Sequence, residues 1–223
     1  MSEIKKPIEA NLNAVRKAIE KSAGRAGREA IGINLVAVSK KQPLDRIKSM
    51  LDCGHMLYGE NRVQEAMERW GELKPKYPNI KLHLIGPLQT NKVKEAVSLF
   101  DVIETVDRPK LAKALAQEMK KQDKWLPCFI QVNTGEEDQK SGILPKDLSA
   151  LLDECKKEGL NIVGLMCIPP QDDPAALHFA FLQKLATEHN LPQLSMGMSS
   201  DFEKAVPLGA TYVRVGTALF GER

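Results

Sequence analysis

A single lysine at the end of an apolar run is the most reactive group in this sequence. Lys40 follows residues 35–39, which alternate as a buried strand does, and it shares a strand face with Val36 and Val38. An amine placed there, with its pKa lowered by partial burial and cationic neighbours, can form a Schiff base with a carbonyl compound. The alternative is a solvated strand end, which is what we expect for the adjacent Lys41.

Two loops near the C-terminus have the composition of a phosphate site. Residues 196–201 and 214–218 each bring glycine and hydroxyl side chains to the start of a helix. The residues concerned are Gly197, Ser199 and Ser200 in the first loop, and Gly216 and Thr217 in the second. Backbone N–H groups, a helix dipole and small hydroxyls are what a phosphate dianion needs. Either serine could instead be an ordinary helix N-cap.

Arg214 interrupts the last apolar run, where a charge is costly unless it is paired. If Val213 and Val215 face outward, Arg214 points into the interior. It could form a structural ion pair with Asp or Glu, or contact an anionic or heteroaromatic ligand. Together with Lys40 and the two loops, it describes a pocket for a phosphorylated carbonyl compound. Pyridoxal 5′-phosphate (PLP) fits these parts, and so does an aldolase-type sugar phosphate.

Eight short apolar runs alternate with longer helical stretches, and no hairpin signal separates any two of them. The runs are residues 33–39, 55–59, 82–86, 102–106, 128–133, 161–167, 193–196 and 211–215. This alternation predicts parallel pairing, because each crossover helix returns the chain to the same end of the sheet. Eight such units close as a single α/β domain over residues 1–223, a (β/α)8 TIM barrel with an extra N-terminal helix at about residues 8–28. A doubly wound open sheet is the alternative.

The composition is that of an ordinary soluble globular protein, with 43% apolar and 27% charged residues. Lys and Arg exceed Asp and Glu by 32 − 29 = 3, which is too few to argue for nucleic acid or membrane. Residues 1–6 contain no signal-peptide run and no stretch could span a bilayer, so we expect a cytoplasmic protein. The four cysteines are widely spaced, and we expect small core residues with no metal or disulfide.

Seven blocks of the sequence resemble the pyridoxal phosphate homeostasis protein family, also called the YggS/PROSC-like proteins. They follow the family order, and the most specific is H-x-I-G-x-L-Q-x-N-K. The blocks are residues 36–40, 59–65, 83–92, 140–142, 164–166, 195–199 and 213–221. Departures are small: Leu82 replaces a common aromatic, Lys41 and Gln42 replace the usual Thr-Lys, and Ser200 stands where Asp is frequent.

The resemblance implies a barrel like the N-terminal domain of alanine racemase, with PLP held as a Schiff base on Lys40. It implies that an arginine, Arg214, lies near the pyridine nitrogen, keeps it unprotonated and so weakens the cofactor as an electron sink. The other cofactor-binding residues that it implies are Ser199, Ser200, Gly216 and Thr217 at the phosphate, Asn61 at the ring, and His83 from the most specific block. It implies no catalytic residue.

The resemblance further implies a role in intracellular PLP homeostasis without established catalysis. We expect a PLP carrier that buffers the cofactor and supplies apo-enzymes. A racemase needs a second acid–base group opposite the lysine, which in racemases comes from an additional domain and a partner subunit. Because this chain stops at Arg223, we expect a monomer without that group. The alternatives are a weak PLP-dependent racemase or other PLP enzyme, and a Schiff-base aldolase.

Overall fold

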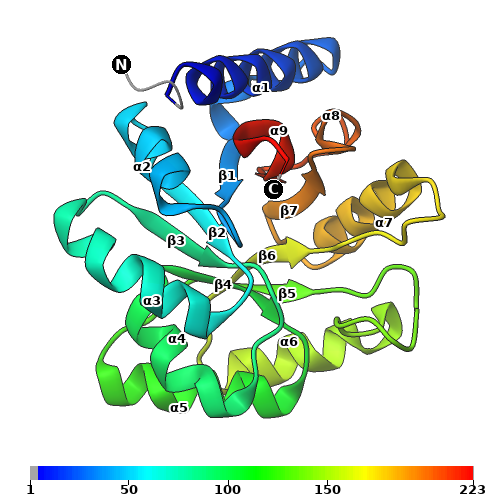
Figure 1. Ribbon diagram of the computed structural model, residues 1–223. Helices are drawn as coiled ribbons and strands as arrows, with labels where there is room; N and C mark the ends of the chain where they lie inside the picture. Colours follow the sequence, from blue (N-terminus) through cyan, green and yellow to red (C-terminus); the bar gives the residue numbers. More distant parts are fainter. Residues whose placement is uncertain (1–4, 223) are drawn as a thin grey trace.

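Eight parallel strands pair in chain order and close into a barrel (Figure 1). The computed structural model describes residues 5–222, so the part of the signal-peptide expectation that concerns residues 1–4 lies outside the described residues. The strands are β1 Asn34–Val38, β2 Leu57–Glu60, β3 Lys81–Leu84, β4 Val102–Val106, β5 Cys128–Gln131, β6 Ile162–Met166, β7 Gln193–Met198 and β8 Tyr212–Val215. The barrel closes where β8 pairs with β1, with Asn34 opposite Tyr212. The predicted (β/α)8 barrel is confirmed and the open sheet is wrong.

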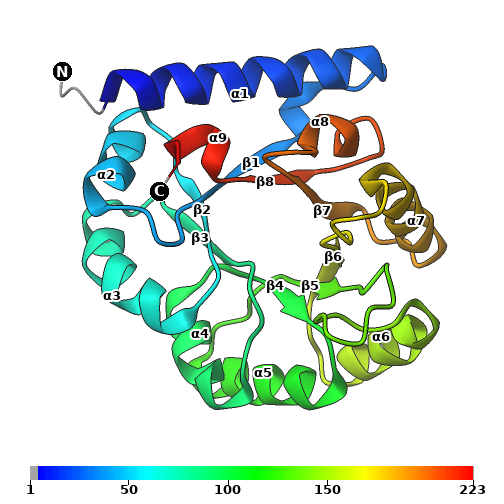
Figure 2. The same cartoon turned by 45° about the vertical axis from the view of Figure 1, so that its right-hand side comes forward.

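Helices surround the barrel as a ring, with α1 lying across the outside beside α2, α8 and α9 (Figure 2). The α-helices are α1 Lys5–Arg25, α2 Leu44–Asp52, α3 Val63–Leu73, α4 Val93–Leu99, α5 Pro109–Gln122, α6 Leu148–Lys157, α7 Ala175–Glu188, α8 Phe202–Ala205 and α9 Thr217–Phe220. Short 3₁₀ turns lead into α4 and α6. The predicted N-terminal helix is confirmed as α1.

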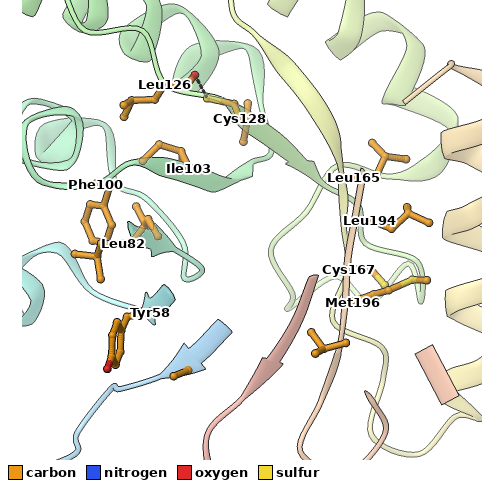
Figure 3. Packing of buried hydrophobic residues seen from close by; sticks show 14 of the residues in the cluster. Tyr58, Leu82, Phe100, Ile103, Leu126, Cys128, Leu165, Cys167, Leu194 and Met196 are labelled. Atoms are coloured by element: carbon orange, nitrogen blue, oxygen red, sulfur yellow. Dashed lines mark hydrogen bonds between the residues drawn. The ribbon is translucent and has the colours of Figure 1, made fainter. Parts of the chain in front are cut away.

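Alternation along each strand separates a helix-facing shell from the barrel interior. On β1, Leu35 and Ala37 join the large apolar cluster under the helices, while Val36 and Val38 are buried on the opposite face. Figure 3 shows part of this shell, with Leu82, Phe100 and Ile103 on neighbouring segments. Residues on the other face, including those that could do chemistry, therefore point into the barrel.

Two strand boundaries differ from the sequence prediction near the expected site. The first strand ends at Val38, because Lys41 has φ 58° and turns the backbone out of the extended conformation. Lys40 thus lies in a turn beyond the strand. The seventh strand continues through Gly197 to Met198, so this glycine, with φ 92°, lies inside the strand. A Cβ there would meet the Ala205 Cβ at 2.6 Å, which gives the glycine a packing role.

The cysteines are free thiols, and three of them are core residues. Burial raises the pKa of Cys155 and of Cys167 to about 12, so these thiols stay protonated at neutral pH. They are the small buried residues that we expected. Among residues 5–222, no helix has both the length and the apolar character needed to cross a bilayer.

The N-terminal helix also holds the last turn of the barrel. Asn11 on α1 donates from Nδ2 to the carbonyl of Leu219 in α9 at 3.1 Å. The Arg46 guanidinium on α2 donates to the carbonyl of Phe220 at 2.9 Å. The first and last helices of the described chain are therefore bound to each other, next to the C-terminal ends of β1 and β8.

Candidate cofactor site

A cavity of about 660 Å³ lies at the C-terminal ends of the strands, and we call it the upper cavity. This is the end of the barrel where TIM-barrel active sites occur. Its lining residues are Val38, Lys40, Gln42, Asn61, Ile85, Ile168, Met198, Ser199, Ser200, Arg214, Gly216, Thr217 and Ala218. The structure thus brings together every expected cofactor-binding residue except His83, which lies deeper in the barrel.

The turn that carries Lys40 is fastened to the end of β2. Ser39 donates from its backbone N–H to the carbonyl of Gly59 at 3.1 Å and from Oγ to Glu60 Oε1 at 2.6 Å. The same carboxylate oxygen accepts from Arg69 at 2.6 Å and from the indole N–H of Trp70 at 3.0 Å. Glu60 therefore anchors the turn to α3 and fixes the direction from which Lys40 enters the upper cavity.

Asn61 is held at the cavity by close contact with the loop after β3. An added Cβ on Gly86 would meet the Asn61 carbonyl oxygen at 2.2 Å and its Cα at 2.7 Å. Both partners are backbone atoms, which cannot move away as the end of a flexible side chain can. Only glycine at position 86 lets the two loops approach this closely.

We expect Gly86→Ala to displace Asn61 and to destabilise the fold by about 1–3 kcal/mol, the usual cost of overpacking. Urea unfolding measures the stability, and a shift of the Asn61 amide resonances reports the displacement. Gly71→Ala in α3 is the matched control, because a Cβ there meets nothing within 4 Å. It should stabilise the helix by about 0.5–1 kcal/mol. Equal stability of the two variants would contradict the close-contact account.

The loops after β7 and β8 are joined by a serine. The backbone N–H of Gly216 donates to Ser199 Oγ at 3.1 Å. Neither serine caps α8, since Asp201 occupies the N-cap position and accepts from the Met198 N–H at 2.6 Å. The two hydroxyls at the upper cavity are therefore not explained by helix capping.

Two further donors come from the backbone at the start of α9. Thr217 and Ala218 are its first residues, and the first N–H groups of a helix have no partner within the helix. Gly216 precedes them, and an added Cβ there would lie 3.4 Å from the Val38 carbonyl oxygen, which is an ordinary contact. Packing within the fold therefore does not require glycine at position 216.

A chain of hydrogen bonds runs through the barrel interior below the upper cavity. Arg214 donates to Ser195 Oγ at 2.7 Å and to the carbonyl of Cys167 at 2.8 Å. Ser195 donates in turn to Glu104 Oε2 at 2.5 Å, and His83 Nδ1 lies 2.6 Å from Glu104 Oε1. The predicted inward direction of Arg214 is confirmed by its neighbours Val213 and Val215, which join the helix-facing shell.

Glu104 is the buried carboxylate at the centre of this chain. Burial by itself raises the pKa of this carboxyl, but hydrogen bonds from His83 and Ser195 and the charges of His83 and Arg214 outweigh burial and lower it. An ionised carboxylate only accepts hydrogen bonds, so Nδ1 of His83 carries the proton in their contact. Arg214 is therefore paired with Glu104 through a serine, and it also faces the upper cavity.

Sequence reasoning missed Glu104 and the structural role of Glu60, although the sequence carried a signal for both. Glu104 is a fully buried acid inside an apolar strand and Glu60 is one at a strand end, which is the same pattern that singled out Arg214. Applied to every strand, that argument would have found the two acids. It would not have shown that Glu60 faces the helices and Glu104 the interior.

Comparison with known proteins gives a family match over most of the chain. The family model described as "Alanine racemase, N-terminal domain" matches residues 8–223. A pyridoxal phosphate homeostasis protein of Pseudomonas aeruginosa is 40% identical and covers 97% of this chain and 96% of its own length. One of Aquifex aeolicus is 39% identical and covers 95% and 96%.

Solved structures agree with this match. PipY of Synechococcus elongatus, solved with PLP bound, has a TM-score of 0.84 and 35% identity, covering 96% of this chain and all of its own. Alanine racemase from Acinetobacter baumannii has a TM-score of 0.74 at 18% identity, covering 98% of this chain and 62% of its own. The second likeness concerns the fold alone.

Proposed function

The chain belongs to the pyridoxal phosphate homeostasis proteins, and we propose that it binds PLP in the upper cavity and buffers the intracellular supply of that cofactor. The observation that carries the proposal is the convergence of Lys40, the two hydroxyl-bearing loops and Arg214 on one cavity. An amine, a set of phosphate donors and a cation match the aldehyde, phosphate and pyridine nitrogen of PLP.

The donor set suits a phosphate dianion. Ser199, Ser200 and Thr217 supply hydroxyls, and the N–H groups at the start of α9 supply further donors. Lys40 enters from β1 on the neighbouring side of the barrel and would hold the cofactor as a Schiff base. Asn61 lines the space left for the ring.

The position of Arg214 favours storage of the cofactor over turnover. When bound, PLP supplies an electron sink whose strength depends on protonation of its pyridine nitrogen. A guanidinium only donates hydrogen bonds, so at that nitrogen it would favour the unprotonated ring. Its pairing with Ser195 and Glu104 keeps the positive charge in place.

The ionisable side chains that line the upper cavity also favour a carrier. Among the described lining residues these are Lys40 and Arg214, and racemisation needs a second group that can exchange a proton on the opposite face. We infer a cytoplasmic PLP carrier, active as a monomer, that passes the cofactor to PLP-dependent apo-enzymes. Exchange of an amino acid's α-hydrogen with solvent, followed by NMR across an amino-acid panel, would contradict this and favour the weak racemase.

The phosphate loops give the direct test of the proposal. We expect the double variant Ser199→Ala, Thr217→Val to bind PLP at least about a hundredfold more weakly, because hydrogen bonds to a charged group contribute about 1.5–3 kcal/mol each and two are removed. Absorbance titration measures this affinity for PLP and for pyridoxal, which lacks the phosphate. Affinity for pyridoxal should stay unchanged, and Thr187→Val on the exposed face of α7 is the control. Equal losses for both ligands would place the phosphate elsewhere.

A further inference from the structure

A second cavity, of about 760 Å³, lies at the opposite end of the barrel. We call it the lower cavity. It is formed where β1, β2, β3, β4 and β8 begin, and the second half of α1 contributes to its wall. Its apolar surface includes Ile33, Leu35, Met56, Leu57, Val102 and Leu126. This volume and this lining are those of a small-molecule site, at an end of the TIM barrel that usually serves stability.

Aromatic rings form two sides of the lower cavity. Trp125 is 50% exposed at its edge, which is unusual for so large an apolar side chain. Tyr212 lies on the inner side, with its ring 5.4 Å from that of His83 and 5.6 Å from that of Phe129. Offset and edge-on contacts with such rings favour a planar ligand.

Charged groups are a minority of the side chains that line the lower cavity. Arg16 and Lys81 bring two positive charges, and Glu20 and Asp101 bring two negative charges, of which Asp101 is already paired with Lys74 at 2.8 Å. His55 adds none, since burial lowers its pKa to about 4 and leaves the ring neutral. Because apolar and aromatic side chains make up most of the lining, it suits a neutral aromatic ligand.

His83 supplies the polar contact inside the lower cavity. It is 3% exposed, lines this cavity, and uses Nδ1–H for Glu104. Within residues 5–222, its Nε2 has no recorded hydrogen-bond partner. This nitrogen accepts a hydrogen bond in the neutral ring and donates one in the charged ring, and a hydroxyl group can pair with it in either form. The lower cavity therefore selects a ligand that carries a hydroxyl group.

The same histidine is the lower end of the hydrogen-bond chain that reaches Arg214. A hydrogen bond at Nε2 polarises the imidazole and changes the strength of the Nδ1–H bond to Glu104, because linked hydrogen bonds affect one another. The bond from Ser195 to the same carboxylate changes in turn, and with it the neutralisation of the Arg214 charge. The effect reaches the upper cavity through three contacts, each 2.5–2.7 Å long.

We propose that the lower cavity binds a small neutral aromatic ligand with a hydroxyl group, and that this ligand changes the affinity for PLP through His83, Glu104, Ser195 and Arg214. The proposal that the lower cavity binds a ligand depends on the geometry of that cavity alone. The proposal that this ligand affects PLP binding rests on the function proposed above.

The test titrates phenol and benzene into the full chain, with and without PLP, and measures dissociation constants by ligand-observed NMR. Phenol should bind about fivefold more tightly than benzene, the effect of one hydrogen bond. This difference should vanish in His83→Phe. Trp125→Ala should weaken the binding of both probes and keep the difference between their affinities. This variant tests whether the probes bind in the lower cavity even if His83→Phe does not fold. Leu177→Ala, an exposed apolar residue that lines neither cavity, should change nothing.

Coupling is measured as the dissociation constant of PLP with and without saturating phenol. We expect the dissociation constant of PLP to change by at least about twofold, and PLP should change that of phenol by the same factor in the same direction, because coupling is reciprocal. Equal binding of phenol and benzene, or unchanged affinities in Trp125→Ala, would overturn the site. Bound phenol with unchanged PLP affinity would overturn the coupling. A chain that binds phenol selectively but does not bind PLP would refute the proposed function and leave the lower cavity standing.

Discussion

The pyridoxyl group should be found on Lys40 when the PLP-loaded protein is reduced with borohydride, digested and analysed by mass spectrometry. Lys40 is the lysine that lines the upper cavity, and Ser39 and Glu60 fix the turn that carries it. Lys40→Ala should lose the covalent adduct and the Schiff-base absorbance. Retention of PLP through gel filtration should fall by at least about tenfold, or ~1.4 kcal/mol.

The adjacent lysine provides the matched control for this result. Lys41 is exposed and lies outside the upper cavity, so Lys41→Ala should keep both the adduct and the absorbance. The α-hydrogen exchange assay should be run on the same protein samples, because it distinguishes a carrier from a weak enzyme. A pyridoxyl adduct on any lysine other than Lys40 would contradict the proposed binding mode.

Glu104→Gln is expected to be the most destabilising polar substitution in the barrel, at about 3–5 kcal/mol. Removing one partner of a buried charge pair leaves the other uncompensated, and Arg214 is only 3% exposed. The new amide N–H₂ would also replace one of the two oxygens that accept from Ser195 and His83, and would face a donor there. Urea unfolding measures the loss, and Glu68→Gln on the exposed face of α3 should stay within about 0.5 kcal/mol.

The pH dependence of unfolding gives a second reading of the same carboxylate. Because the folded pKa of Glu104 lies below its ordinary value of 4.5, the ionised form is favoured by folding. Its stabilisation is fully present above pH 4.5 and is lost as the pH falls from there through the lower folded pKa. The wild-type protein should lose more stability in this range than Glu104→Gln. Parallel acid titrations of the two proteins would show that Glu104 is not the group responsible.

Much of the fold and the upper cavity was predictable from the chain because strand alternation is a local property. The faces of β1 and β8 follow from residues 35–38 and 213–215, and these faces direct Lys40 and Arg214 to the interior. Eight units in order then bring the loops after β7 and β8 beside β1. That these residues meet at one cavity could therefore be predicted without knowing any side-chain contact.

The network beneath that cavity was not predictable in the same way. Glu104 and Ser195 are 91 residues apart, and their contact depends on how far each strand is shifted along its neighbour. That shift also places His83 at the lower cavity, although the resemblance had placed it among the cofactor-binding residues. The predicted seventh strand ended too early, because a glycine such as Gly197 is typical of a loop. In the structure, Gly197 stays in β7, where it packs closely against Ala205.

The bond between the first and last helices has a consequence for how the protein is made. Asn11 and Leu219 are 208 residues apart, and β1 must wait for β8 before the barrel closes. Contacts of such high contact order form late in folding, and during synthesis β8 leaves the ribosome after the other seven strands. Lys40 is thus made before the loops proposed to hold the phosphate. PLP can stabilise the closed barrel by mass action, but it has no assembled site to bind on a chain still being synthesised.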